Sequence, residues 1–216
     1  MTSRPIRRLP RQDRSRAMVE RILAAGRSVL IEHGYERAST SRIAAAAGIS
    51  PGSLYQYFAD KDAILGQVLD RYTDQLQARI TDAFMTNLGA ASQRGERAAV
   101  RGVFEVMLGV LEADAPMLRV LVEQPPLGAS RQRLAEFPKQ VDQLVTTALL
   151  FQLGPRGRPV DAAAWILVRS IRGVTVNYAL DPPPIGRDVI LDELTDLVMS
   201  YLGPIEPSRP ALCQPS

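Results

Sequence analysis

Apolar residues recur every three or four positions along most of this sequence, a spacing that allows little besides α-helices. The first such stretch holds Val19, Ile22, Leu23 and Leu30, which share one face of a helix. A second long stretch runs over residues 64–84 with the same spacing. Clear strand-type alternation and Asn-Gly or Asp-Gly hairpin signals are absent from the sequence. The pattern therefore predicts an all-α fold.

Glycine and proline clusters separate the helical stretches and indicate about nine helices. We expect them at 14–33, 41–47, 51–58, 61–89, 95–113, 115–123, 130–153, 159–180 and 186–202. Three short helices precede a long one, which divides the chain into a small N-terminal part and a larger helical body. The expected organisation is a flexible basic arm at 1–13, a three-helix domain at 14–60, a helical domain at 61–203 and a flexible Pro-rich tail at 204–216.

Few residues suited to metal binding or acid–base chemistry are present. Cys213 is the single cysteine and His33 the single histidine, so the sequence excludes an internal disulfide and zinc sites built on several thiolates or imidazoles. We therefore expect no metal and no cofactor. No apolar run approaches the roughly 18 residues that span a membrane, and the basic start lacks the apolar segment of a signal peptide. These features predict a cytoplasmic protein without membrane contact.

Charge is concentrated at the N-terminal end of the chain. Residues 1–62 carry 11 basic and six acidic side chains, whereas residues 63–216 carry 15 basic and 17 acidic ones. A basic end on a mildly acidic body favours an anionic partner at the N-terminus, such as nucleic acid. The first arginines could enter a DNA minor groove. A solvated, disordered tail is the alternative interpretation.

The strongest motif is a helix-turn-helix, predicted at about 38–57. Ser39 or Thr40 can cap its first helix, and Gly48 can end that helix with a positive φ. Ser50 can cap the second helix. Two short helices joined by a glycine-containing turn have the form of a DNA-binding motif, in which the second helix enters the major groove.

The residue types at this motif suit contacts with a DNA duplex. The hydroxyls of Thr40 and Ser41 lie at a helix start, where free backbone N–H groups can also meet a phosphate. Lys61 can reach another phosphate, and the Tyr57 hydroxyl can donate a hydrogen bond to the DNA backbone. Gln56 can pair with adenine through two hydrogen bonds. The candidates for contacts with base edges are Ser53, Tyr55 and Gln56.

Residues 15–75 resemble the DNA-binding domain of the TetR (tetracycline repressor) family. The resemblance is carried, in order and spacing, by Gly34, Tyr35, Thr40, Ile43, Ala44, Ala47, Gly48, Ile49, Ser50, Gly52, Ser53, Leu54, Tyr55, Tyr57, Phe58, Lys61 and Leu65. By motif position it implies DNA contacts at Thr40, Ser41, Pro51, Gly52, Ser53, Tyr55, Gln56, Tyr57 and Lys61. It also implies a homodimer that pairs through the helices near 159–180 and 186–202 and binds a palindromic operator on double-stranded DNA.

The same resemblance implies an inducer pocket within the helical body. Apolar and aromatic residues at helical spacing are core residues first, but some can line such a cavity. The candidates are Phe104, Met107, Leu111 and Trp165. The small number of charges nearby favours an apolar or amphipathic ligand. The predicted function is a dimeric repressor that this ligand releases from its operator.

Several alternatives stay open. The chain could be an activator, or a regulator of the same fold that needs no ligand. The sequence Gly48–Gly52 matches the G-x-S-x-G motif of serine hydrolases, but Pro51 has no N–H for an oxyanion hole and the preceding segment is helical. Another helical enzyme, or a protein-interaction module, is a more remote alternative. We expect no catalytic residues.

Overall fold

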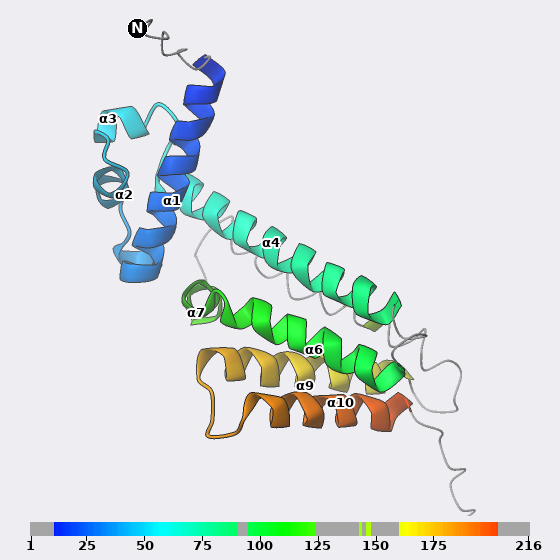
Figure 1. Cartoon of the computed structure of the whole chain (residues 1–216). Coiled ribbons are helices and arrows are strands. Elements are labelled where there is room, and N and C mark those ends of the chain that lie inside the picture. Colours follow the sequence, from blue (N-terminus) through cyan, green and yellow to red (C-terminus); the bar gives the residue numbers. More distant parts are fainter. Residues whose placement is uncertain (1–10, 90–94, 124–142, 144–145, 148–159, 203–216) are drawn as a thin grey trace, which may run out of the picture. The chain divides into compact units, whose positions relative to one another are not determined.

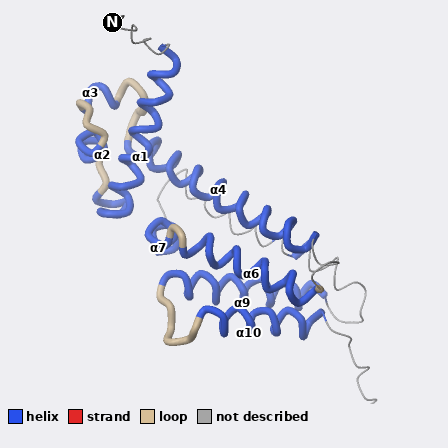
Figure 2. The backbone as a smooth tube through the Cα atoms, in the orientation of Figure 1, coloured by secondary structure: helices blue, strands red, loops and turns tan. Residues whose placement is uncertain are grey.

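The computed structural model describes residues 11–89, 95–123, 143, 146–147 and 160–202 (Figures 1 and 2). All regular structure in these residues is α-helical, which confirms the predicted fold class. The described helices are α1 (Arg11–Arg37), α2 (Thr40–Ala46), α3 (Pro51–Leu54), α4 (Lys61–Gly89), α6 (Glu96–Glu112), α7 (Ala115–Glu123), α9 (Val160–Leu180) and α10 (Arg187–Leu202). The helix predicted at 130–153, the arm before residue 11 and the tail after residue 202 lie outside them.

The chain forms two compact units. The first contains residues 1–78 and 111–139, and the second contains residues 79–110 and 140–216. Helices α4 and α6 each contribute to both units. The first unit therefore combines the helix-turn-helix with α7, which lies much later in the sequence.

The core of the first unit brings α1 against the start of α4. Ile22 and Leu30 of α1 and Ile64 and Leu65 of α4 are fully buried. The two helices approach closely at Gly26, where an added Cβ would lie 2.8 Å from Cγ2 of Ile64. The missing side chain of Gly26 therefore sets the distance between α1 and α4.

Helix α1 contains a break near its end. Gly34 has φ 73° and ψ 171°, which is not helical, and the ribbon resumes for one short turn to Arg37. The sequence predicted the end of this helix at His33, directly before the break. The observed helix ends at Arg37 instead, because Ala38 still donates its backbone N–H to the Gly34 carbonyl, at 3.2 Å.

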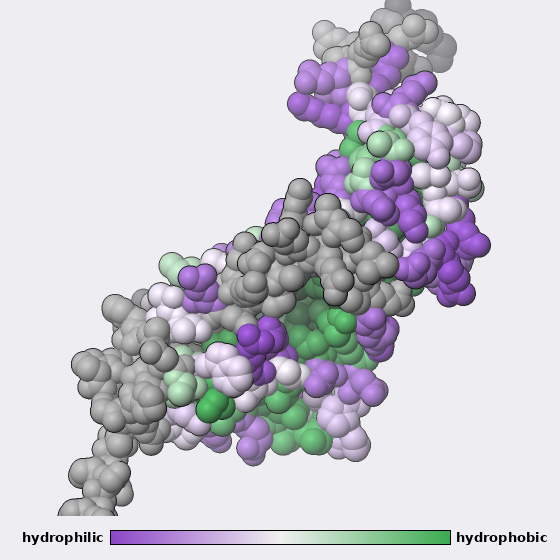
Figure 3. All heavy atoms as spheres, turned by 180° about the vertical axis from the view of Figure 1, so that it is seen from behind, coloured by the Kyte–Doolittle hydropathy of each residue, from purple (hydrophilic) through white to green (hydrophobic). Residues whose placement is uncertain are grey.

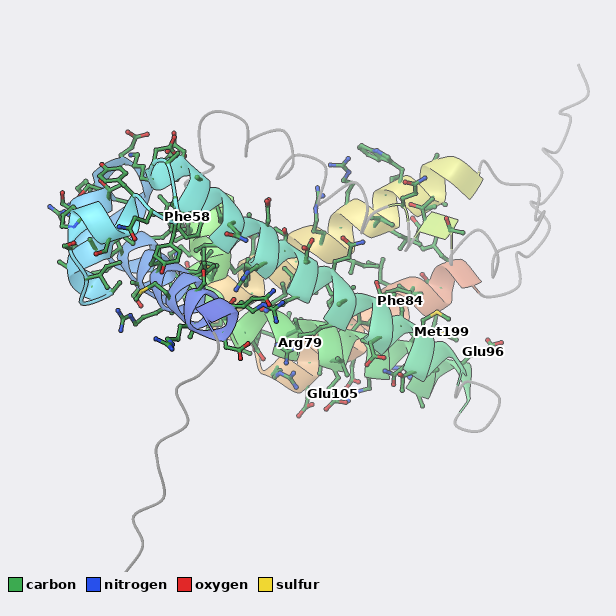
Figure 4. All side chains as sticks on the ribbon, turned by 90° about the horizontal axis from the view of Figure 1, so that it is seen from above. Phe58, Arg79, Phe84, Glu96, Glu105 and Met199 are labelled. Carbon is green, nitrogen blue, oxygen red and sulfur yellow. The ribbon has the colours of Figure 1, made fainter. Side chains whose placement is uncertain are left out.

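The second unit packs the end of α4, most of α6, and helices α9 and α10. Its fully buried side chains include Leu108 of α6, Leu167 of α9 and Leu191 of α10. Figure 4 shows the side chains, with Phe84 of α4 and Met199 of α10 labelled in this unit and Phe58 in the first.

A ladder of ion pairs joins α6 to α10 in the second unit. Arg101 donates to Asp188 at 2.8 Å and to Asp192 at 2.9 Å, and Arg97 pairs with Asp196. The Arg97 guanidinium holds the pKa of Asp196 below its usual range, chiefly through their hydrogen bond. The aspartates recur every four residues, so they form one stripe along α10 that faces the arginines of α6.

The close approach of α1 and α4 gives a direct prediction for stability. We expect Gly26→Ala to lower the free energy of unfolding by about 1–3 kcal/mol, because the new methyl group overpacks a buried contact. Chemical denaturation followed by circular dichroism measures the effect.

Gly89→Ala is the matched control, because a Cβ at Gly89 meets nothing within 4 Å. Alanine is favoured over glycine in helices, so this control should not lose stability. Because Gly26→Ala also gains helix propensity, the control is its reference: a stability equal to that of Gly89→Ala would show that the α1–α4 contact accommodates the methyl group at no cost.

Candidate nucleic-acid interface

The first helix of the helix-turn-helix, α2, is held by its cap and by a small buried face. Ser39 is the N-cap, and its side chain accepts the backbone N–H of Arg42 at 3.3 Å. Ile43 and Ala44 are fully buried. After the helix ends, Gly48 has φ 64°. This is the left-handed conformation predicted for the turn, which glycine adopts without steric cost.

The second helix, α3, begins as the sequence predicts. Ser50 is its N-cap and accepts the backbone N–H of Ser53 at 3.1 Å, while Pro51 occupies the first turn. Ser50 and Ser53 also share a hydrogen bond between their hydroxyls at 2.9 Å. Leu54 is fully buried and anchors the helix to the domain.

Helix α3 is shorter than the predicted span of 51–58. It ends at Leu54, and residues 55–57 continue as a tighter turn. Gln56 donates to the Ser53 carbonyl at 3.3 Å and Tyr57 to the Leu54 carbonyl at 2.9 Å, which are bonds across three residues rather than four. Bonds of this kind tighten the last turn of a helix. Two of the predicted base contacts, Tyr55 and Gln56, therefore follow the helix instead of lying within it.

The structure brings most of the predicted contact residues to one exposed surface. The exposed members are Ser41 on α2 and Pro51, Gly52, Tyr55 and Gln56 on and after α3; Thr40, Ser53 and Tyr57 are partly exposed. Thr40 and Tyr55 join the two helices through a hydrogen bond between their hydroxyls at 3.1 Å. This bond orients the ring of Tyr55, which is 55% exposed. A Cβ at Gly52 would meet only the Ser50 hydroxyl, at 3.9 Å, so its outer side is open to a partner.

Lys61 is held by the protein at the start of α4. Its ammonium donates to the Tyr35 carbonyl at 3.2 Å and lies 5.2 Å from the centre of the Tyr35 ring. The Tyr35 hydroxyl donates to Asp62 at 2.8 Å. Burial and this hydrogen bond raise the pKa of Tyr35. The start of α4 is further held by Asp60, which accepts the backbone N–H of Ala63 at 2.7 Å and so caps the helix.

Tyr35 supports this surface from behind, a role that the sequence did not predict. It is buried and connects the end of α1 to the first turn of α4. Its place directly after Gly34 was a weak signal, because a chain that turns at a glycine needs an anchor on its far side. The partners of Tyr35 lie 26 and 27 residues away, and no spacing rule predicts such a pair.

The four candidate pocket residues do not share one environment. Phe104 and Met107 are buried in the second unit, and Leu111 is buried in the first. Trp165 is instead 61% exposed on α9, where the Arg169 guanidinium lies 5.6 Å from the centre of its ring.

Comparison with known proteins agrees with this geometry. Residues 22–68 match the family described as bacterial regulatory proteins, tetR family. The helix-turn-helix-type transcriptional regulator AlkX of Mycobacterium tuberculosis is 28% identical over 202 residues, which cover 88% of this chain and 89% of AlkX. Residues 22–68 are a TetR-family DNA-binding domain.

Solved structures show the TetR fold along most of the chain. The TetR regulator PfmR of Thermus thermophilus superposes with a TM-score of 0.63 at 21% identity and covers 87% of this chain and 97% of its own. The fatty acid degradation regulator FadR of Bacillus halodurans gives 0.58 at 20% identity, over 86% of this chain and 95% of its own. Likeness at this level of identity concerns the fold alone.

This domain makes the chain a DNA-binding transcriptional regulator of the TetR type. The helix-turn-helix is thus its DNA-binding element. Among the helices that the structure describes, none combines the length and the apolar character needed to cross a lipid bilayer.

The different environments of two serines predict different effects of the same change. Ser50→Ala removes a helix cap, and we expect a loss of about 1 kcal/mol in unfolding free energy. Ser41→Ala, at an exposed position, should leave stability unchanged and weaken binding to DNA. Thermal unfolding and fluorescence anisotropy with a labelled duplex separate the two effects. A destabilised Ser41→Ala variant would mean that this hydroxyl supports the fold.

Proposed function

We propose that this TetR-family chain is a dimeric repressor that binds a palindromic operator and is released by a small apolar or amphipathic ligand. The observation that carries the proposal is the exposed surface formed by α2, α3 and the turn after α3, with a buried anchor behind it. Its second helix is short and capped, and its outer side chains can form hydrogen bonds with bases and phosphates.

The proposed contacts follow from the position of each side chain. Thr40 and Ser41 bind phosphate at the start of α2, and Lys61 adds a positive charge at the start of α4. Gly52 and Pro51 allow the duplex backbone to approach closely, and the Tyr57 hydroxyl donates a hydrogen bond to that backbone. Base edges are bound by Ser53, Tyr55 and Gln56.

The proposed dimer forms through α9 and α10. Both helices carry large apolar side chains at the surface of the second unit, where Figure 3 shows apolar groups exposed. These side chains are Trp165, Ile166 and Val174 on α9 and Val189 and Leu197 on α10. The acidic stripe of α10 is engaged by α6, which leaves the apolar residues available for a second copy. Two copies would supply the two recognition helices, about 34 Å apart, that a palindrome needs.

The proposed ligand belongs to the fatty acyl class. FadR of Bacillus halodurans shares only its fold with this chain, so the proposed ligand class rests on the side chains buried in the helical body. Phe104 and Met107 are buried in the helical body, and aromatic and thioether side chains suit an alkyl chain. Repression is favoured because a dimer bound to its operator excludes other proteins from that duplex without further contacts.

Selection from a random DNA pool tests the operator proposal. We expect the wild type to enrich a palindrome, with half-sites centred about 10 base pairs apart or a multiple of that distance. Gln56→Ala should lose its preference at one position of each half-site, since a bidentate base contact contributes about 1–3 kcal/mol of discrimination. Unchanged preferences in Gln56→Ala and Tyr55→Ala would contradict the base-reading role of the turn after α3.

A charge placed in the apolar surface tests the dimer. We expect Trp165→Glu to weaken dimerisation by about a hundredfold or more, because it replaces a large apolar contact with a carboxylate that the interface must desolvate, even with Arg169 nearby. Sedimentation equilibrium measures the monomer–dimer constant. Val122→Glu is the matched control, since Val122 is 49% exposed on α7, outside the proposed interface. A dimer of wild-type strength in Trp165→Glu would require a different interface.

Titration with oleate or oleoyl-CoA tests ligand release. We expect the anisotropy of a labelled operator bound by the wild type to fall as ligand is added, with the free protein favoured because ligand binds it better than the DNA-bound form. An unlabelled detergent of equal chain length serves as control. Tighter DNA binding with oleate would indicate ligand-dependent binding instead of release, and no effect would remove the fatty acyl class.

A further inference from the structure

Helix α7 belongs to the unit that contains the helix-turn-helix, although it follows α6 in the sequence. Helices α1 and α7 are packed against each other within this unit. Asp114 stands directly before α7, and its carbonyl accepts the backbone N–H groups of Met117 and Leu118, both at 3.0 Å. A movement of Asp114 therefore moves the first turn of α7 with it.

The side chain of Asp114 binds the DNA-binding helices through Arg27. One terminal nitrogen of Arg27, on α1, lies 2.5 Å from each carboxylate oxygen of Asp114. The pair joins positions 87 residues apart, and the Asp114 side chain is 27% exposed. This partly screened, charge-assisted contact connects α1 directly to the junction between α6 and α7.

A buried tyrosine lies in the electrostatic field of this pair. Tyr72 on α4 is 8% exposed, and its hydroxyl has no hydrogen-bond partner in the described part of the chain. Burial raises the pKa of Tyr72, the charge of Asp114 raises it further, and the charge of Arg27 lowers it. A buried hydroxyl without a hydrogen-bond partner is unfavourable, so a hydrogen bond from the Tyr72 hydroxyl to an acceptor would be stabilising.

We propose that Arg27, Tyr72 and Asp114 form the junction through which α7 and the DNA-binding helices sense each other's state. Asp114 has a partner in Arg27 and a potential second one in the Tyr72 hydroxyl. A shift of the α6–α7 junction replaces the Asp114–Arg27 contact with an Asp114–Tyr72 contact. This changes how strongly α7 is attached to α1. The two arrangements form a bistable element of the kind that allosteric coupling requires. All three are positioning residues, since none belongs to the proposed DNA surface.

The proposal rests on the ligand-released mechanism proposed above, but its test needs no ligand. Coupling between two sites is reciprocal, so DNA binding must change the state of α7 if α7 controls DNA binding. If oleate does not release the wild type from its operator but α7 still responds to DNA, the ligand proposal is overturned and the junction proposal stands.

The chain offers a matched control pair. Arg71 on α4 donates to both carboxylate oxygens of Glu20 on α1, at 2.6 and 2.8 Å. This pair has the same chemistry and joins α1 to another helix of the same unit, but it does not involve α7. Removing its charge therefore reports the general cost of losing an ion pair on α1.

Hydrogen–deuterium exchange of the full chain, with and without the tightest-binding duplex from the pool, tests the junction. In the wild type we expect DNA to slow the exchange of α7 amides by about fivefold, the scale of one exposed charged contact. Asp114→Asn and Arg27→Gln should lose this response, and the charge exchange Arg27→Asp with Asp114→Arg should restore it. Glu20→Gln should keep it. Thermal unfolding verifies that each variant is folded.

Tyr72→Phe tests the second partner. Removing the hydroxyl leaves Arg27 as the partner of Asp114, so without DNA the α7 amides should exchange more slowly than in the wild type, and the further slowing by DNA should shrink. Exchange without DNA at the wild-type rate or faster would overturn the role of the hydroxyl. An α7 that ignores DNA in the wild type, or an Asp114→Asn variant that responds like Glu20→Gln, would overturn the whole proposal.

Discussion

The close packing of α1 on α4 at Gly26 is the constraint on which the DNA-binding unit depends. With no side chain at Gly26, Ile64 fills the contact, and the first turns of α4 contribute the buried Ile64 and Leu65 to the core beside α1. The same packing allows Tyr35, Lys61 and Asp62 to meet at the end of α1. The close approach of α1 to the start of α4 thus depends on the absence of a side chain at Gly26.

The features of the motif that sequence reasoning predicted correctly are all local. The cap at Ser39, the positive φ at Gly48 and the cap at Ser50 each depend on residues within four positions. The bounds of the described helices of the body, α4, α6, α7, α9 and α10, were also predicted within one or two residues, because apolar periodicity is strong there. Such signals need no knowledge of tertiary contacts.

The features that the sequence could not predict depend on distant partners. The shortening of α3 arises from bonds across three residues, which no residue type in the segment demands. The contact of Lys61 with Tyr35, the pairing of Arg27 with Asp114, and the membership of α7 in the first unit all join segments far apart in the chain. The exposure of Trp165 likewise depends on which face of α9 its own unit leaves uncovered.

Some residues of α3 and the turn after it position the helix, whereas others face outward. This separation affects how such regulators diversify. The placement of α3 is maintained by Ser50, Pro51 and the buried Leu54, while the open side of Gly52 and the exposed side chain of Gln56 take little part in that support. Substitutions at the outward positions can therefore alter which duplex is preferred at little cost to folding. A duplicated gene can acquire a new target through few mutations and remain a stable protein throughout.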